Sequence, residues 1–76
     1  MLGKDEIVGE ACSIVVNGSA VETRAVRLDA LLIELGYGDS KVATALNGEF
    51  VPSPARSETA ISAGDRIEVV APRQGG

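Results

Sequence analysis

The most regular apolar pattern in the chain is a run of leucines with helical spacing. Positions i, i+3, i+4 and i+7 are occupied by Leu28, Leu31, Leu32 and Leu35. This spacing predicts a helix with one apolar face that can cover a small sheet. Asp29 lies in the first turn, where the helix dipole favours an acid, and Gly36 is placed to end the helix in a left-handed conformation. No obvious N-cap residue precedes Leu28, so a start one or two residues earlier stays open.

Before the leucines, an Asn-Gly pair joins two runs with strand-like composition. Residues 12–16 are rich in β-branched side chains, and residues 19–23 follow directly after Asn17-Gly18. Asn-Gly between two such runs is the strongest short-range signal for a two-residue hairpin. One face of this hairpin is expected to carry the core side chains Cys12, Ile14, Val16 and Val21.

A second Asn-Gly pair, Asn47-Gly48, follows the predicted helix. It joins an expected strand over residues 41–46 to a short return strand over residues 49–51, which Pro52 ends. Residues 53–60 are expected to be irregular, with a proline breaking their start and one helical turn near residues 57–59.

The last predicted strand covers residues 66–71, after a turn at residues 63–65. Ile61 is expected to anchor the preceding segment to the core. Within the strand, apolar positions alternate with charged ones, so one face should pack on the core. Those positions are Ile67, Val69 and Ala71.

The element order predicts a two-layer α+β domain, in which one main helix packs on a mixed sheet of four to five strands. A hairpin, a helix and then further strands let the first and last strands lie side by side in parallel at the sheet centre. This is the β-grasp, or ubiquitin-like, arrangement. We expect it to span residues 12–71, between a flexible leader at 1–11 and a flexible tail at 72–76.

Composition narrows the function. A formal net charge of −4, with one Phe, one Tyr and no Trp, is unlike a nucleic-acid binder. Without His and with one Cys, the chain offers neither a His-based triad nor a Cys/His zinc site, and Cys12 is expected to be a small buried hydrophobe. Acidic residues near the N-terminus and the lack of a long apolar run predict no signal peptide and no membrane span, hence a cytoplasmic protein.

The candidate chemistry lies in residues 72–76, Pro-Arg-Gln-Gly-Gly. Gly75 and Gly76 have no Cβ, so this backbone can enter a channel too narrow for side chains, with Gly76 presenting an unhindered α-carboxyl. Arg73 and Gln74 are expected to thread into a partner with the glycines. Arg73 either pairs with an acidic or phosphate group there or stays solvated. The alternative interpretation of the whole segment is an ordinary frayed terminus.

Three stretches resemble the ThiS family of sulfur carrier proteins. They are Ala-Leu-Asn-Gly-Glu-Phe-Val-Pro at 45–52, Gly-Asp-Arg-Ile-Glu-Val-Val at 64–70 and the Gly-Gly end at 72–76, and the likeness covers residues 12–76. Residues 53–56, Ser-Pro-Ala-Arg, depart from the family, where a more basic stretch with an aromatic residue is expected.

The resemblance implies a carrier and not an enzyme. A ThiF-type adenylating enzyme, using ATP and magnesium that it binds itself, would activate the carboxylate of Gly76. Sulfur from a cysteine desulfurase would then give a thiocarboxylate, and a ThiG-type thiazole synthase would take that sulfur. No cofactor or metal is expected to bind to this chain. Val70 and Phe50 are expected either to form an exposed apolar patch that docks the adenylating enzyme or to be ordinary packing residues.

Three other functions stay open at this point. The small subunit of molybdopterin synthase resembles this chain in fold and in its Gly-Gly end, and fold cannot separate the two. A non-covalent ubiquitin-like binding module would make the glycines incidental. A protein modifier would use the same adenylate but form links to lysines.

Overall fold

The computed structural model describes residues 10–38 and 40–71, and it confirms the α+β prediction. The elements in chain order are β1 (Cys12–Val16), β2 (Ser19–Thr23), α1 (Leu28–Glu34), β3 (Ala43–Leu46), β4 (Glu49–Val51), the 3₁₀ helix η2 (Ser53–Glu58) and β5 (Arg66–Val70). The predicted leader at 1–11 falls mainly, and the predicted tail at 72–76 falls wholly, outside the described residues.

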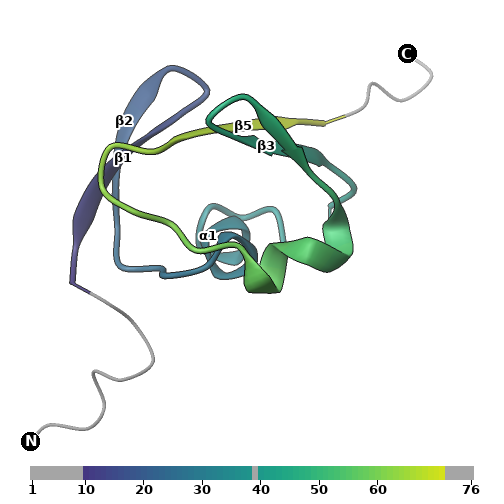
Figure 1. Ribbon diagram of the computed structural model, residues 1–76, viewed down its shortest axis with the longest axis horizontal. Helices are drawn as coiled ribbons and strands as arrows, with labels where there is room; N and C mark the ends of the chain where they lie inside the picture. The colour runs from purple at the N-terminus through teal and green to yellow at the C-terminus, as the bar shows by residue number, and fades with distance from the viewer. Residues whose placement is uncertain (1–9, 39, 72–76) are drawn as a thin grey trace, which may run out of the picture.

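The five strands form one mixed sheet in the order β2-β1-β5-β3-β4. The central pair β1 and β5 is parallel, with Val16 opposite Ile67, while the other three pairings are antiparallel. Figure 1 shows α1 lying against one face of this sheet, with the segment between β4 and β5 passing beneath the helix in that view. The last strand therefore lies in the interior of the sheet, between the two hairpins.

The core lies between α1 and the sheet, and the leucine stripe supplies its helical side. Leu28 and Leu31 are completely buried, and so is Ile67 from β5. Val21 and Leu35 pack against this core while partly exposed, and Ile61 is buried as predicted. Cys12 is half-buried at the start of β1, so it is less enclosed than the sequence suggested.

The helix begins at Leu28 without a side-chain N-cap, and not one or two residues earlier. Its first amide is satisfied from elsewhere in the fold, because Leu28 N donates to Thr59 O at 2.9 Å. At the other end Gly36 has φ +94°, as predicted, and its N–H donates to Ile33 O. Tyr37 N then donates to Leu32 O at 2.8 Å, which completes a Schellman motif.

Two strand boundaries differ from prediction. β3 begins at Ala43 instead of residue 41, because the carbonyl of Val42 is bonded by an arginine side chain and not by a strand. β5 ends at Val70, which pairs with the first residue of β3. Ala71 consequently lies outside the strand and is exposed, whereas it was expected on the core face.

The segment after β4 is more ordered than predicted. Residues Ser53–Glu58 form a 3₁₀ helix, instead of an irregular stretch with one turn near residues 57–59. Pro54 was expected to break structure, but it lies in the first turn of this helix. Proline is tolerated there because its missing N–H has no helical partner to lose.

Candidate functional site

The described part of the candidate site is β5, the strand that leads into the tail. Its last residue, Val70, is followed by Ala71, after which the chain continues into residues 72–76. The predicted site residues Arg73, Gln74, Gly75 and Gly76 lie outside the described residues. The structure therefore describes what holds and surrounds the base of the tail.

Backbone hydrogen bonds fix β5 from both sides. On the β1 side, Val15 N donates to Asp65 O and Asn17 N donates to Ile67 O, both at 2.9 Å. On the β3 side, the register runs from Leu46 opposite Ile67 to Ala43 opposite Val70. A strand that is paired on both sides is the element of a small sheet best protected against local unfolding. The tail therefore follows a stable strand.

The two hairpin asparagines add side-chain bonds to β5, a role that the sequence analysis missed. Asn17 Oδ1 accepts from Val69 N at 2.9 Å, and its Nδ2 donates to Val69 O at 3.1 Å. At the other end of the strand, Asn47 Oδ1 accepts from Arg66 N at 2.9 Å. The signal lay in the topology: β1 runs parallel to β5 and β3 antiparallel, so their turns fall at opposite ends of β5.

The sheet face opposite α1 carries an apolar strip beside the end of β5. Val70 is 61% exposed and Phe50 is 70% exposed. They are connected through β3, because Val70 pairs with Ala43 and Phe50 pairs with Ala45, two positions on the same face of one strand. We call Val70, Ala43, Ala45 and Phe50 the open-face strip. Val70 and Phe50, for which the sequence left a patch or ordinary packing open, thus belong to one continuous surface.

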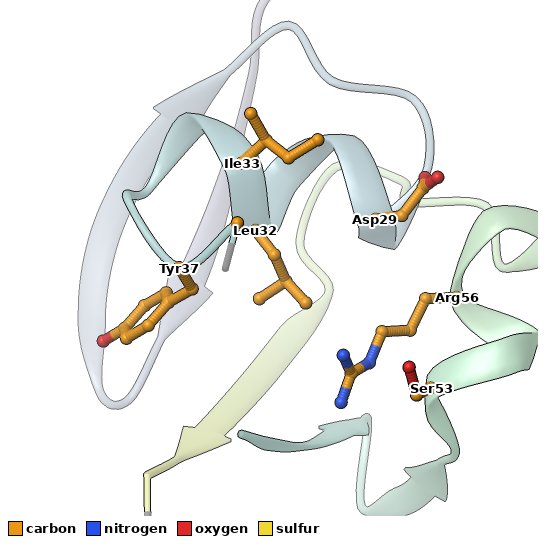
Figure 2. Close-up of a pocket in the computed structure, with 7 residues that line it drawn as sticks. Asp29, Leu32, Ile33, Tyr37, Ser53 and Arg56 are labelled. Atoms are coloured by element: carbon orange, nitrogen blue, oxygen red, sulfur yellow. The ribbon is translucent and has the colours of Figure 1, made fainter. Parts of the chain in front are cut away.

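A cavity of about 200 Å³ lies between α1 and η2, on the helix side of the molecule (Figure 2). Two of its polar side chains form hydrogen bonds: Arg56 Nη2 donates to Val42 O at 2.6 Å, and Asp29 Oδ1 accepts from Ala30 N at 2.8 Å. In Figure 2 the Asp29 carboxylate points away from Arg56. The hydrogen bonds of its described lining residues pair no nucleophile with a base.

Residues 10–38 and 40–71 lack two features. No group of three or more His, Cys, Asp or Glu residues there could hold a metal ion. None of the described helices is long and apolar enough to cross a membrane.

Comparison with known proteins identifies the family. The family model described as the ThiS family matches residues 6–76. The chain belongs to the ThiS family. The predicted resemblance is thereby confirmed, and with it a ubiquitin-like sulfur carrier of the thiamine-biosynthesis type.

A solved structure agrees with this assignment to the ThiS family. The crystal structure of the thiamine biosynthesis protein ThiS from Geobacter metallireducens superposes with a TM-score of 0.72 at 26% identity. The match covers 84% of this ThiS-family chain and 99% of that chain. The β-grasp prediction is confirmed by this likeness together with the observed strand order.

One curated relative is a larger protein. A thiazole synthase from Paramagnetospirillum magneticum (strain ATCC 700264 / AMB-1) is 39% identical over 59 residues, which are 76% of this chain. The matched segment is 18% of that relative, so the ThiS-family chain spans about a fifth of the relative's length.

Proposed function

We propose that Gly76 is the residue on which this carrier bears sulfur for thiazole formation. The observation that carries the proposal is the family match, which runs through Gly75 and Gly76. This role requires Gly76 to be the carboxyl-terminal residue of the protein. Without side chains, these two residues suit a narrow channel in an enzyme that must reach a backbone carboxylate.

The chemistry requires activation because a carboxylate is a poor acyl donor. In the proposed sequence the Gly76 carboxylate attacks the α-phosphorus of ATP, and pyrophosphate leaves. A persulfide sulfur from a cysteine desulfurase displaces AMP from the resulting acyl-adenylate. A thiol then reduces the acyl disulfide and releases the thiocarboxylate. ATP and magnesium are bound by a ThiF-type adenylating enzyme, which supplies the catalytic groups.

The open-face strip is the proposed docking surface for that enzyme. It places an apolar area directly beside the base of the tail, since Val70 is only six residues before Gly76. Six residues of extended chain reach roughly 20 Å, which is enough to enter an active site while the domain stays docked. Val70 and Phe50 supply most of the exposed apolar surface of the strip.

Thiazole synthase is the proposed acceptor of the sulfur. The curated relative with this name contains a segment 39% identical to this chain over 59 residues. That observation favours the thiazole branch over molybdopterin synthesis. Under this proposal the carrier dissociates from the adenylating enzyme and delivers its thiocarboxylate through the same narrow tail.

Intact-mass analysis of protein isolated from its own host tests the covalent chemistry. We expect a species in which one oxygen is replaced by sulfur, with the change localised to Gly76. The thiocarboxylate form, used as bait, is expected to retain thiazole synthase; retention of a molybdopterin synthase large subunit would assign the other branch. Masses corresponding to conjugates with other proteins would indicate a protein modifier.

A carboxyl-terminal extension separates the carrier from a non-covalent module. Adding one Ala after Gly76 removes the glycine carboxylate and adds a methyl group to the tail. We expect this variant to abolish ATP–pyrophosphate exchange by the ThiF-type enzyme. Unchanged exchange would refute the proposal.

A further inference from the structure

Asn17 continues the central sheet beyond the point where its backbone turns away. β1 ends at Val16, and Asn17 adopts φ +51° in the hairpin turn. Its own N–H still donates to Ile67 O, so it is the last backbone rung between β1 and β5. The next backbone groups of β5 that face this side are the N–H and C=O of Val69, where β1 has no residue left to offer.

The side chain of Asn17 fills that gap. Its Oδ1 accepts from Val69 N at 2.9 Å, and its Nδ2 donates to Val69 O at 3.1 Å. A primary amide has the same acceptor and donor as a peptide group, so it takes the place of one more strand residue. Val70 is held from the other side by its pairing with Ala43. Ala71 is the first residue outside the strand.

We propose that Asn17 is a positioning residue for the sulfur-carrying tail, because it fixes where β5 ends and the tail begins. This inference rests on the proposed role of Gly76. Without the two side-chain bonds, the Val69 backbone loses its partners on one side and the end of β5 can fray. The adenylating enzyme must then order additional backbone when it binds the tail. Ordering one residue of free backbone lowers the binding constant about 5- to 30-fold.

Few residue types can replace Asn17 without changing the turn or the bonds to Val69. Positive φ favours Asn, Asp and Gly, because other side chains are strained in the left-handed region. Of these three, Gly keeps the turn but has no side chain to bond Val69. Asp keeps the acceptor for Val69 N but turns a second oxygen toward Val69 O, where Asn17 places its donor.

Asn47 provides a matched control within the same chain. It also has φ +51°, precedes a glycine in a hairpin turn, and uses its side chain to accept from a β5 amide, Arg66 N, at 2.9 Å. Its Nδ2 donates to Asp65 Oδ1 at 3.1 Å. These bonds are at the start of β5, away from the tail. Replacing Asn47 therefore removes two similar bonds without loosening the base of the tail.

The test compares full-length Asn17→Gly and Asn47→Gly in ATP–pyrophosphate exchange with the ThiF-type enzyme, at a temperature where urea titrations show both variants folded. We expect Asn17→Gly to lower kcat/KM for the carrier about 5- to 30-fold and Asn47→Gly to leave it close to wild type. Asn17→Asp keeps one of the two bonds, so its kcat/KM is expected to lie between those of Asn17→Gly and wild type. If Asn17→Gly does not fold, Asn17→Asp takes its place in the comparison. Equal effects of the Asn17 and Asn47 variants would overturn the inference.

Backbone NMR on the free proteins separates this inference from the proposed function. Asn17→Gly is expected to lower the order parameters of Val69, Val70 and Ala71 and to speed exchange of the Val69 amide. Asn47→Gly is expected to change only the start of β5. If the wild-type protein supports no ATP–pyrophosphate exchange at all, the proposed function fails. The NMR comparison still decides whether Asn17 holds the end of β5. Unaltered order at Val69–Ala71 in Asn17→Gly would overturn it.

Discussion

Arg56 Nε donates a hydrogen bond of 3.1 Å to Thr44 Oγ1, which joins η2 to the middle of β3. Thr44 is 2% exposed, and its hydroxyl in turn donates to Val51 O at 2.8 Å. Arg56 also donates from Nη2 to Val42 O at 2.6 Å, just before β3 begins. One half-buried arginine thus anchors the crossover segment directly to β3 and, through the Thr44 hydroxyl, to β4.

Replacing Arg56 with Ala is expected to lower the free energy of unfolding by about 1–2 kcal/mol. The change leaves Val42 O without its side-chain donor and removes the charged donor from Thr44 Oγ1. Arg56→Lys is expected to lower the free energy of unfolding by more than half as much as Arg56→Ala, because an ammonium cannot reproduce the two directed bonds of a guanidinium. Urea denaturation measures all three proteins. Arg24→Ala is the control: Arg24 is exposed, so equal losses would contradict the anchoring role.

The fold could be predicted from the sequence wherever the local signals agreed with the packing of the folded chain. Two Asn-Gly turns and one leucine stripe placed both hairpins and the helix, and their order predicted the parallel central pair. The anchoring role of Arg56 was not predictable in the same way. A half-buried arginine with two acceptors has the same sequence signature as a solvated one, because its partners become neighbours only after the chain folds.

The helix start that the sequence left open and the wrong end of β5 have the same origin. Leu28 needs no side-chain cap because Thr59 O, thirty-one positions later, accepts from its N–H. Ala71 continues the alternation of β5 but has no partner strand, since β3 begins opposite Val70. In the candidate site, the sequence left Val70 and Phe50 open between an exposed patch and ordinary packing, and the structure exposes both. The bonds from Asn17 to Val69 required knowledge of which strands are neighbours.

Leu31 and Ile33 offer a direct test of the helix orientation. Leu31 is completely buried, so Leu31→Ala creates a cavity under α1 and is expected to lower the free energy of unfolding by about 2–5 kcal/mol. Ile33 lies two residues later and is 68% exposed. Ile33→Ala is therefore expected to change stability by less than about 0.5 kcal/mol. Circular dichroism with urea measures both, and similar losses would mean that the helix packs with a different face.

Gly36 and Gly38 form a second matched pair. Gly36 has φ +94°, so Gly36→Ala forces a Cβ into a left-handed conformation, at a cost of about 1–2 kcal/mol. At Gly38 an added Cβ would meet Ile33 Cγ1 at 3.5 Å, an ordinary contact, and no positive φ is involved. Gly38→Ala is expected to be neutral or slightly stabilising. Thermal unfolding measures the stability of both variants. A larger loss of stability in Gly38→Ala than in Gly36→Ala would contradict the assignment of the helix end.

The open-face strip makes the docking proposal testable without disturbing the fold. Phe50 and Val70 are 70% and 61% exposed, so Phe50→Ser and Val70→Ser are expected to leave the urea midpoint nearly unchanged. If the adenylating enzyme buries either side chain, the serine variant should raise KM for the carrier about tenfold, while saturating carrier still gives turnover.

Ile33→Ser is the control for these variants. Ile33 is as exposed as Phe50 and equally apolar, but it lies on α1, which packs on the opposite face of the sheet (Figure 1). Its replacement is expected to leave KM unchanged. A shift of similar size in Ile33→Ser would mean that the enzyme responds to general surface hydrophobicity. A shift in Ile33→Ser alone would move the docking surface to the helix face. Only a rise in KM that is confined to the Phe50 and Val70 variants agrees with an enzyme that docks on the sheet face, beside the base of the tail.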